Sequence, residues 1–143
     1  MQWLSRWETF ALASAFFAGL TALLGKIGVM NVNSNLGTFI RTVVVLIMTA
    51  CILIWRHQWQ WPQGTAMKAW IFLVLSGIAT GLSWLCYYRA LSLGPVSKVA
   101  PIDKLSVAFA IILGIIFLGE NLTWQVVLGG GLIILGAAVI ILF

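Results

Sequence analysis

Apolar residues follow one another in five long runs along the chain, separated by short polar stretches. Each run approaches the roughly 20 residues that an α-helix needs to cross the hydrocarbon core of a bilayer. The runs show no regular alternation of polar and apolar positions, which excludes the strands of a closed β-barrel. We therefore predict an all-α membrane protein whose single domain, residues 1–143, has five transmembrane helices, over residues 7–30, 36–55, 69–88, 96–119 and 124–143.

Some of the predicted helices begin at residues that favour helix starts. Ser34 or Asn35 can cap the second helix, and Pro95 fits the first turn of the fourth, where a missing N–H has no consequence. A second proline, Pro101, falls inside the fourth helix, where it removes a backbone hydrogen bond and frees a carbonyl. We expect a kink there, which either shapes helix packing or loosens the helix beside a cavity.

The composition fits a chain surrounded by lipid. Hydrophobic residues make up 62% of it and charged residues 8%, against about 25% charged residues in a soluble domain, so a water-soluble enzyme is excluded. The net charge of +5 does not indicate a nucleic-acid partner, because the basic residues occur singly beside apolar runs rather than in one stripe. The lipid bilayer is therefore the predicted environment.

The sequence holds no recognisable catalytic constellation. It has no Ser/His/Asp or Cys/His set for nucleophilic catalysis, no cluster with metal-ligand spacing, and no glycine-rich phosphate loop before a helix. We therefore predict that the protein is not an enzyme, binds no metal and uses no cofactor.

Asp103 is the acidic residue deepest in a predicted span. If the fourth helix begins at Val96, Asp103 lies roughly 10 Å along its axis. A carboxylate at that depth is costly, so it pairs with a cation, lines a wet cavity, or binds a proton or cation. Two interpretations stay open: a functional coupling site, or a structural ion pair with Lys98, Lys104, Arg89 or Lys26.

Aromatic and basic residues gather at the end of the third predicted helix. Trp84, Tyr88 and Arg89 fall within two helical turns, and aromatic rings line cavities through cation–π contacts. An interfacial aromatic belt explains Tyr88 equally well, so Trp84, one turn deeper, is the better cavity residue. Lys104 either snorkels to the interface or meets an anionic group, and Glu120 either lies in water or helps to cap the fifth helix. The full set of candidate transport or substrate residues is Asp103, Lys104, Pro101, Trp84, Tyr88, Lys98, Lys26, Arg41, Arg89 and Glu120.

Small residues recur at regular intervals on the first, third and fifth predicted helices. Gly77 with Gly81, and Gly129 with Gly136, are examples of a spacing that lets membrane helices approach closely. These stripes are candidate surfaces for another helix or another chain.

Several stretches of the sequence resemble the EamA domain of the drug/metabolite transporter superfamily. They are Ala90-Leu91, the run Gly94-Pro95-Val96-Ser97-Lys98-Val99-Ala100-Pro101-Ile102-Asp103-Lys104-Leu105-Ser106, and Leu118-Gly119-Glu120-Asn121-Leu122-Thr123. Lys26, which closes the first helix, and Arg41, which opens the second, fit the same pattern. The length and the five spans are similar to the short five-helix branch of the superfamily, which implies a bacterial or archaeal cell membrane as the location.

The resemblance also implies a fold and an activity. Longer members are ten-helix carriers made of two inverted five-helix halves, and they move amino acids, nucleotide sugars, drugs or other metabolites. This chain would be one half, and a homodimer, antiparallel in one arrangement, would supply both halves. Our first hypothesis is a secondary transporter that exports small metabolites or drugs by alternating access as a dimer. The alternative is a non-transporting membrane subunit or flippase half that partners another membrane protein.

The transporter hypothesis gives the candidate residues separate roles. Asp103 would bind the coupling proton or a cationic group, Trp84 and Tyr88 would line the cavity, and Pro101 would loosen the fourth helix. The basic residues would either favour cargo that carries a carboxylate or phosphate, or simply pair and snorkel; they are Lys26, Arg41, Arg89, Lys98 and Lys104.

Overall fold

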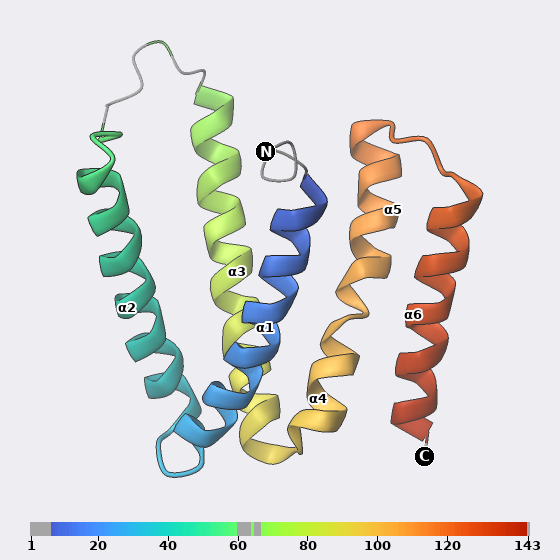
Figure 1. The fold of residues 1–143 in the computed structure, drawn as a ribbon, viewed down its shortest axis with the longest axis horizontal. Coiled ribbons are helices and arrows are strands. Elements are labelled where there is room, and N and C mark those ends of the chain that lie inside the picture. Colours follow the sequence, from blue (N-terminus) through green and yellow to red (C-terminus); the bar gives the residue numbers. More distant parts are fainter. Residues whose placement is uncertain (1–6, 60–63, 65–66, 143) are drawn as a thin grey trace. The chain divides into compact units, whose positions relative to one another are not determined.

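The computed structural model of the chain describes residues 7–59, 64 and 67–142. Within these residues the chain forms helices and no strands, and the helices are α1 (Trp7–Val29), α2 (Ser34–Trp55), α3 (Met67–Leu93), α4 (Val96–Asp103), α5 (Ser106–Leu118) and α6 (Trp124–Leu142) (Figure 1). Because α4 and α5 together span Val96–Leu118, five segments are long and apolar enough to cross a membrane. The predicted all-α fold with five membrane-length segments is confirmed.

The helix ends differ from the predicted ones at several points. α2 begins at Ser34 because Asn33 is its N-cap, and the Asn33 side chain accepts a hydrogen bond from the Asn35 amide at 2.9 Å. Our prediction of Ser34 or Asn35 as the cap was therefore wrong. α3 continues beyond residue 88 to Leu93, and residue 143 of the fifth predicted helix lies outside the described residues.

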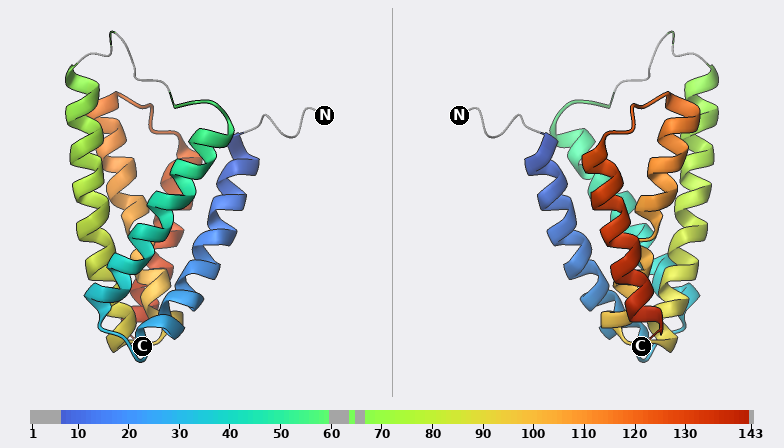
Figure 2. Two further views of the ribbon diagram at one scale, coloured as in Figure 1. Left: turned by 90° about the vertical axis from the view of Figure 1, so that its left-hand side faces the viewer. Right: turned by 90° about the vertical axis from the view of Figure 1, so that its right-hand side faces the viewer.

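The chain divides into two compact units. We call Gly25–Ser92 the α2–α3 unit, and Met1–Leu24 with Leu93–Phe143 the α4–α6 unit; α1 contributes to both. In the α2–α3 unit, α2 and α3 converge toward the end where α2 begins and α3 ends, and they separate toward the other end (Figures 1 and 2). The buried side chains of this unit lie at the converging end, and they include Val29, Ser34, Thr38, Tyr88 and Leu91.

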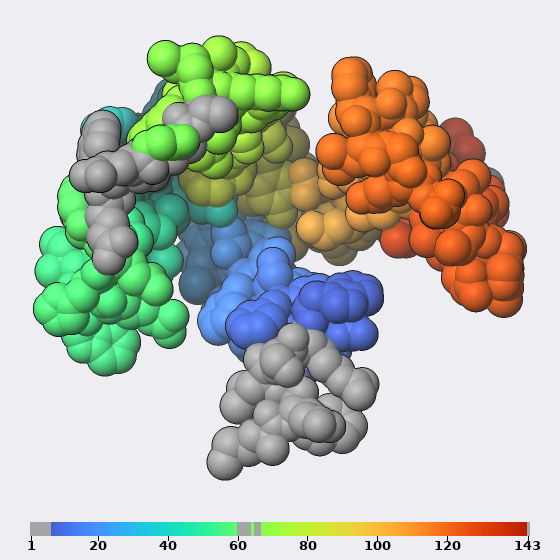
Figure 3. All heavy atoms as spheres, turned by 90° about the horizontal axis from the view of Figure 1, so that it is seen from above, coloured from blue at the N-terminus to red at the C-terminus, as the bar shows by residue number. Residues whose placement is uncertain are grey.

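The α4–α6 unit is organised around its last helix. α6 packs against both α4 and α5. Seen from above, the atoms of α5 adjoin those of the connection to α6 (Figure 3). α5 ends at Gly119, whose φ of 67° is left-handed, and the Glu120 amide closes the turn by donating to the Gly114 carbonyl at 3.3 Å. Gly130 of α6 approaches α5 so closely that a Cβ there would lie 2.9 Å from Cδ1 of Ile111.

Most large apolar side chains of the described residues are exposed. In each membrane-length segment, no more than 11% of the most hydrophobic stretch is buried by the chain itself. Apolar surface on this scale is unfavourable in water, so lipid or another chain must cover it.

Candidate functional site

Tyr88 is the centre of the converging end of the α2–α3 unit. Tyr88 is 6% exposed and Leu91, on the same face of α3, is fully buried. Glycines let α1 and α2 approach this ring: a Cβ at Gly25 would lie 3.2 Å from the Tyr88 hydroxyl, and a Cβ at Gly37 would lie 3.5 Å from its Cδ1. The end of α1, the start of α2 and the end of α3 therefore pack tightly about one tyrosine.

Lys26 closes this junction from α1. Its Nζ donates a hydrogen bond to the Leu91 carbonyl at 2.7 Å. That carbonyl belongs to the last turn of α3, where the helix itself provides no N–H donor for the backbone oxygens. A positive charge is favourable there, because the helix dipole is negative at this end. Lys26 thus holds the end of α3 against α1.

Arg41 stacks over the aromatic residues of α3. Its guanidinium carbon lies 3.8 Å from the centre of the Trp84 ring and 5.5 Å from that of Tyr88, which are cation–π distances. Within the described residues its guanidinium makes no hydrogen bond or ion pair. The stack therefore fixes the charge while the N–H groups at its edge stay available for an anion.

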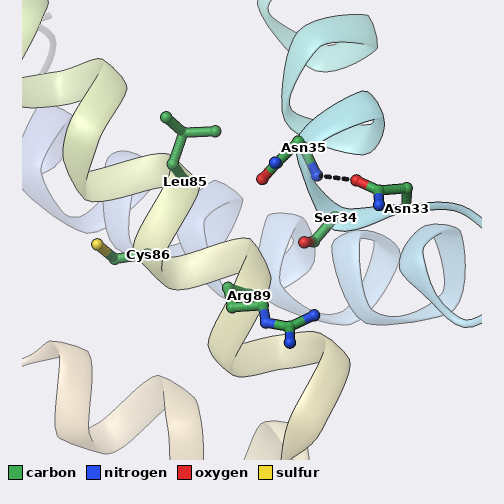
Figure 4. Close-up of a pocket in the computed structure, with 6 residues that line it drawn as sticks. All are labelled: Asn33, Ser34, Asn35, Leu85, Cys86 and Arg89. Carbon is green, nitrogen blue, oxygen red and sulfur yellow. Dashed lines mark hydrogen bonds between the residues drawn. The ribbon is translucent and has the colours of Figure 1, made fainter.

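Arg89 lies on a neighbouring face of α3 and lines a pocket of about 390 Å³ (Figure 4). It extends toward the start of α2, on the side of Ser34 and Asn33. The lining residues are Asn33, Ser34, Asn35, Leu85, Cys86 and Arg89.

Five of the ten predicted site residues belong to the α2–α3 unit: Lys26, Arg41, Trp84, Tyr88 and Arg89.

The other five predicted residues belong to the α4–α6 unit, where the segment predicted as one helix over 96–119 is divided in two. Around the break the chain makes bonds of a tighter turn, from the Lys104 amide to the Pro101 carbonyl at 3.1 Å and from Leu105 to Ile102 at 3.0 Å. Proline cannot donate to the Ser97 carbonyl, so the regular helix pattern fails at this point. Pro101 itself stays inside α4, and the break follows it at residues 104–105, where the backbone remains right-handed in a tightened turn between α4 and α5.

Asp103 ends α4 and pairs with its neighbour across the break. The Lys104 Nζ and Asp103 Oδ2 lie 3.5 Å apart, and the two side chains are 54% and 38% exposed. Of the partners considered for Asp103, the structure pairs it with Lys104. An exposed ion pair of adjacent residues stabilises the fold by at most about 1 kcal/mol. The pair with Lys104 therefore does not explain why a carboxylate lies inside a membrane-length segment.

Lys98 and Glu120 lie away from that pair. Lys98 is exposed on α4. The Glu120 carboxylate folds back over α5, because its Oε2 lies 2.8 Å from the position of a Cβ on Gly114. Glu120 therefore contacts the end of α5 by both its amide and its side chain.

Sequence reasoning missed part of the α2–α3 junction. Ser34, Thr38 and Arg41 recur at helical spacing and form a polar stripe on a mostly apolar helix, a signal that could have identified the face of α2 that meets α3. The glycine stripes that we did predict make no such contact: a Cβ at Gly77 or Gly136 meets no atom within 4 Å in the described part of the chain. The described residues also contain no group of His, Cys, Asp and Glu side chains that could hold a metal ion.

Comparison with known proteins identifies a family and a relative of this chain. The EamA-like transporter family matches residues 5–142. A protein of Sinorhizobium sp, named as an uncharacterized transporter in the cobO 3'region, is 48% identical over 137 residues, covering 96% of this chain and 97% of that protein. No solved structure matches.

Proposed function

Since this chain belongs to the EamA-like transporter family, we propose that it is a secondary transporter that exports small metabolites or drugs by alternating access. It is an integral, multi-pass membrane protein and a transporter, so its surroundings are a lipid bilayer and its cargo is a small molecule.

The observation that carries the proposal is the stack of Arg41 on Trp84. Charged side chains inside membrane segments are expensive and usually line a path for substrate or ions. Residues 25–92 contain no acidic residue, so the α2–α3 unit has no counter-ion of its own for Arg41. We infer that a carboxylate or phosphate of the cargo fills this role, bound by the free edge of the guanidinium while Trp84 and Tyr88 contact the rest of the molecule.

We assign the coupling role to Asp103. The interruption after Pro101 leaves two half-helices in one membrane-length segment, and transporters use such ends to bind substrates and coupling ions. Asp103 sits at the carboxyl end of α4, where the helix dipole is negative and favours the binding of a proton or cation. Its exposed pair with Lys104 leaves it open to that exchange.

We propose a homodimer as the working unit. The described chain buries little of its own apolar surface, and the small residues Gly77 and Gly136 face no atom of the same chain within 4 Å. A second chain docked on such stripes would bury this surface and supply the other half of an inverted-repeat transporter.

Transport by the purified protein tests the proposed function. The protein, reconstituted in liposomes, is assayed for uptake and efflux with labelled organic acids, sugar phosphates, amino acids and organic cations. We expect saturable transport of an anionic compound by the purified chain alone. Transport that appears only after a different protein is added would instead support the subunit hypothesis.

Assembly is tested by mass measurement in lipid discs. Gly77→Leu and Gly136→Leu should convert dimers to monomers, whereas Gly28→Leu, at another position with no atom within 4 Å but outside the stripes, should leave the dimer intact. A wild-type protein that is monomeric and transports at full rate would refute the dimer.

A further inference from the structure

The pocket between the start of α2 and the end of α3 has a use separate from the Arg41 stack. Polar groups from the start of α2 and from α3, both in the α2–α3 unit, line it (Figure 4). Arg41, Trp84 and Tyr88 are not among its lining residues. The transport proposal therefore gives this pocket no role.

Ser34 indicates that the pocket takes a ligand. It is 6% exposed, and its hydroxyl, which makes no hydrogen bond within the described residues, faces the pocket (Figure 4). The hydroxyl oxygen is open to the pocket, so it can donate a hydrogen bond to an acceptor bound there.

Backbone amides at the start of α2 point to the same kind of ligand. The Asn35 amide is used by the Asn33 side chain at 2.9 Å, and the Gly37 amide by the Asn33 carbonyl at 2.9 Å. Helix geometry provides no acceptor for the other amides of the first turn, those of Ser34 and Leu36. Together with the positive end of the helix dipole, these groups favour an oxyanion.

Arg89 supplies a full positive charge from the facing helix. Its guanidinium makes no ion pair in the described residues, and the sequence of residues 25–92 offers no carboxylate to compete for it. Donors from α3 on one side and from α2 on the other suit an anion with oxygens in several directions. A pocket of about 390 Å³ has room for a substituted phosphate, since ligand sites begin at about 300 Å³.

We propose that this pocket binds a phosphate group, held by Arg89 on one side and by Ser34 and the first turn of α2 on the other. It lies at the end of the membrane-length segments beside the connection from α1 to α2, where both lipid headgroups and dissolved phosphates have access. The shared chemistry is the phosphate oxyanion, and the source is either an anionic phospholipid or a soluble phosphate compound.

Calorimetric titration of the purified protein in a phosphate-free nonionic detergent tests the site. The probes are inorganic phosphate and dihexanoyl phosphatidic acid, with zwitterionic dihexanoyl phosphatidylcholine as the control for insertion of the acyl chains. We expect saturable binding near one ligand per chain. Arg89→Gln should weaken it by at least about 10-fold and Ser34→Ala by about 3-fold.

The matched control is Arg56→Gln, which removes the same charge from the opposite end of α2 and should change affinity by less than about 2-fold. Much tighter binding of the phosphatidic acid than of inorganic phosphate assigns the site to lipid headgroups, and equal binding assigns it to soluble phosphates. The proposal is overturned if neither probe saturates, or if Arg89→Gln and Arg56→Gln have equal effects. Should Arg89→Gln fail to fold, unchanged affinity in Ser34→Ala overturns it instead.

Discussion

Five of the eight basic residues lie in the α2–α3 unit, whereas all three acidic residues lie in the α4–α6 unit. The net charge of +5 therefore belongs entirely to residues 25–92, and the other unit is balanced. The units differ in backbone too, because α2 and α3 are continuous while the fourth membrane-length segment is interrupted after Pro101. The excess positive charge thus lies in a unit whose long helices are continuous, and the other unit holds the acidic residues, with Asp103 next to the break between α4 and α5.

Arg41→Gln is the sharpest test of the α2–α3 unit, and we expect it to lower the transport rate by at least about 100-fold. The change removes two charge-assisted hydrogen bonds to the anion, each worth about 1.5–3 kcal/mol, and every 1.4 kcal/mol is a factor of ten. Arg41→Lys should lose about 10-fold, because an ammonium keeps the charge without the planar fork or the stack on Trp84. Initial rates in liposomes measure both variants.

Arg56→Gln, at the C-cap of the same helix, is the control for Arg41 and should transport normally. Equal loss in Arg41→Gln and Arg56→Gln would mean that the whole positive field of the unit matters and that the stack has no special role. Full transport by Arg41→Lys would show that charge alone suffices.

The membrane segments and the two groups of charges could be predicted from the sequence, but the contacts between helices could not. A run of about 20 apolar residues identifies a span by itself. By contrast, the periodicity of α2 and of α3 gives the faces of each helix without saying which faces meet, so Arg41 and Trp84 were candidates that we did not pair. Gly25 and Gly37 were missed for the same reason, since their importance comes from the Tyr88 ring on another helix.

The α4–α6 unit is tested by Asp103→Asn, which keeps the shape of the side chain and removes its titratable group. We expect at least about a 10-fold loss of accumulation driven by a proton gradient, with exchange of cargo across the membrane retained. The protein should still fold, because the pair with Lys104 is exposed and such pairs add at most about 1 kcal/mol.

Glu8→Gln is the matched control for Asp103, since Glu8 is an exposed acid in the first turn of α1. Transport by Asp103→Asn that still responds fully to pH would exclude the coupling role. A failure to express would instead show that the carboxylate is needed for packing.

Pro101→Ala removes the difference in backbone between the two units. Alanine restores the N–H that can bond to the Ser97 carbonyl, so α4 and α5 should join into one helix and the protein should gain roughly 1–3 kcal/mol of stability. We expect transport to fall by about threefold, because a continuous helix resists the bending that alternating access needs. Pro95→Ala, at the N-cap of α4, is the control, and transport unaffected by Pro101→Ala would show that the interruption is only structural.

The smallest predicted effect concerns how tightly α6 packs, and the neighbours Gly129 and Gly130 test it. Both lie inside α6, so alanine gives each the same gain in helix propensity, about 0.5–1 kcal/mol. A Cβ at Gly129 meets no atom within 4 Å in the described chain, whereas one at Gly130 would lie 2.9 Å from Cδ1 of Ile111 on α5. Overpacking of that kind costs typically 1–3 kcal/mol, so Gly129→Ala should raise the unfolding temperature in detergent and Gly130→Ala should lower it. Ile111→Val in the Gly130→Ala background should restore part of the loss by shortening the side chain, and equal unfolding temperatures for the two alanine variants would show that α5 and α6 do not pack this closely.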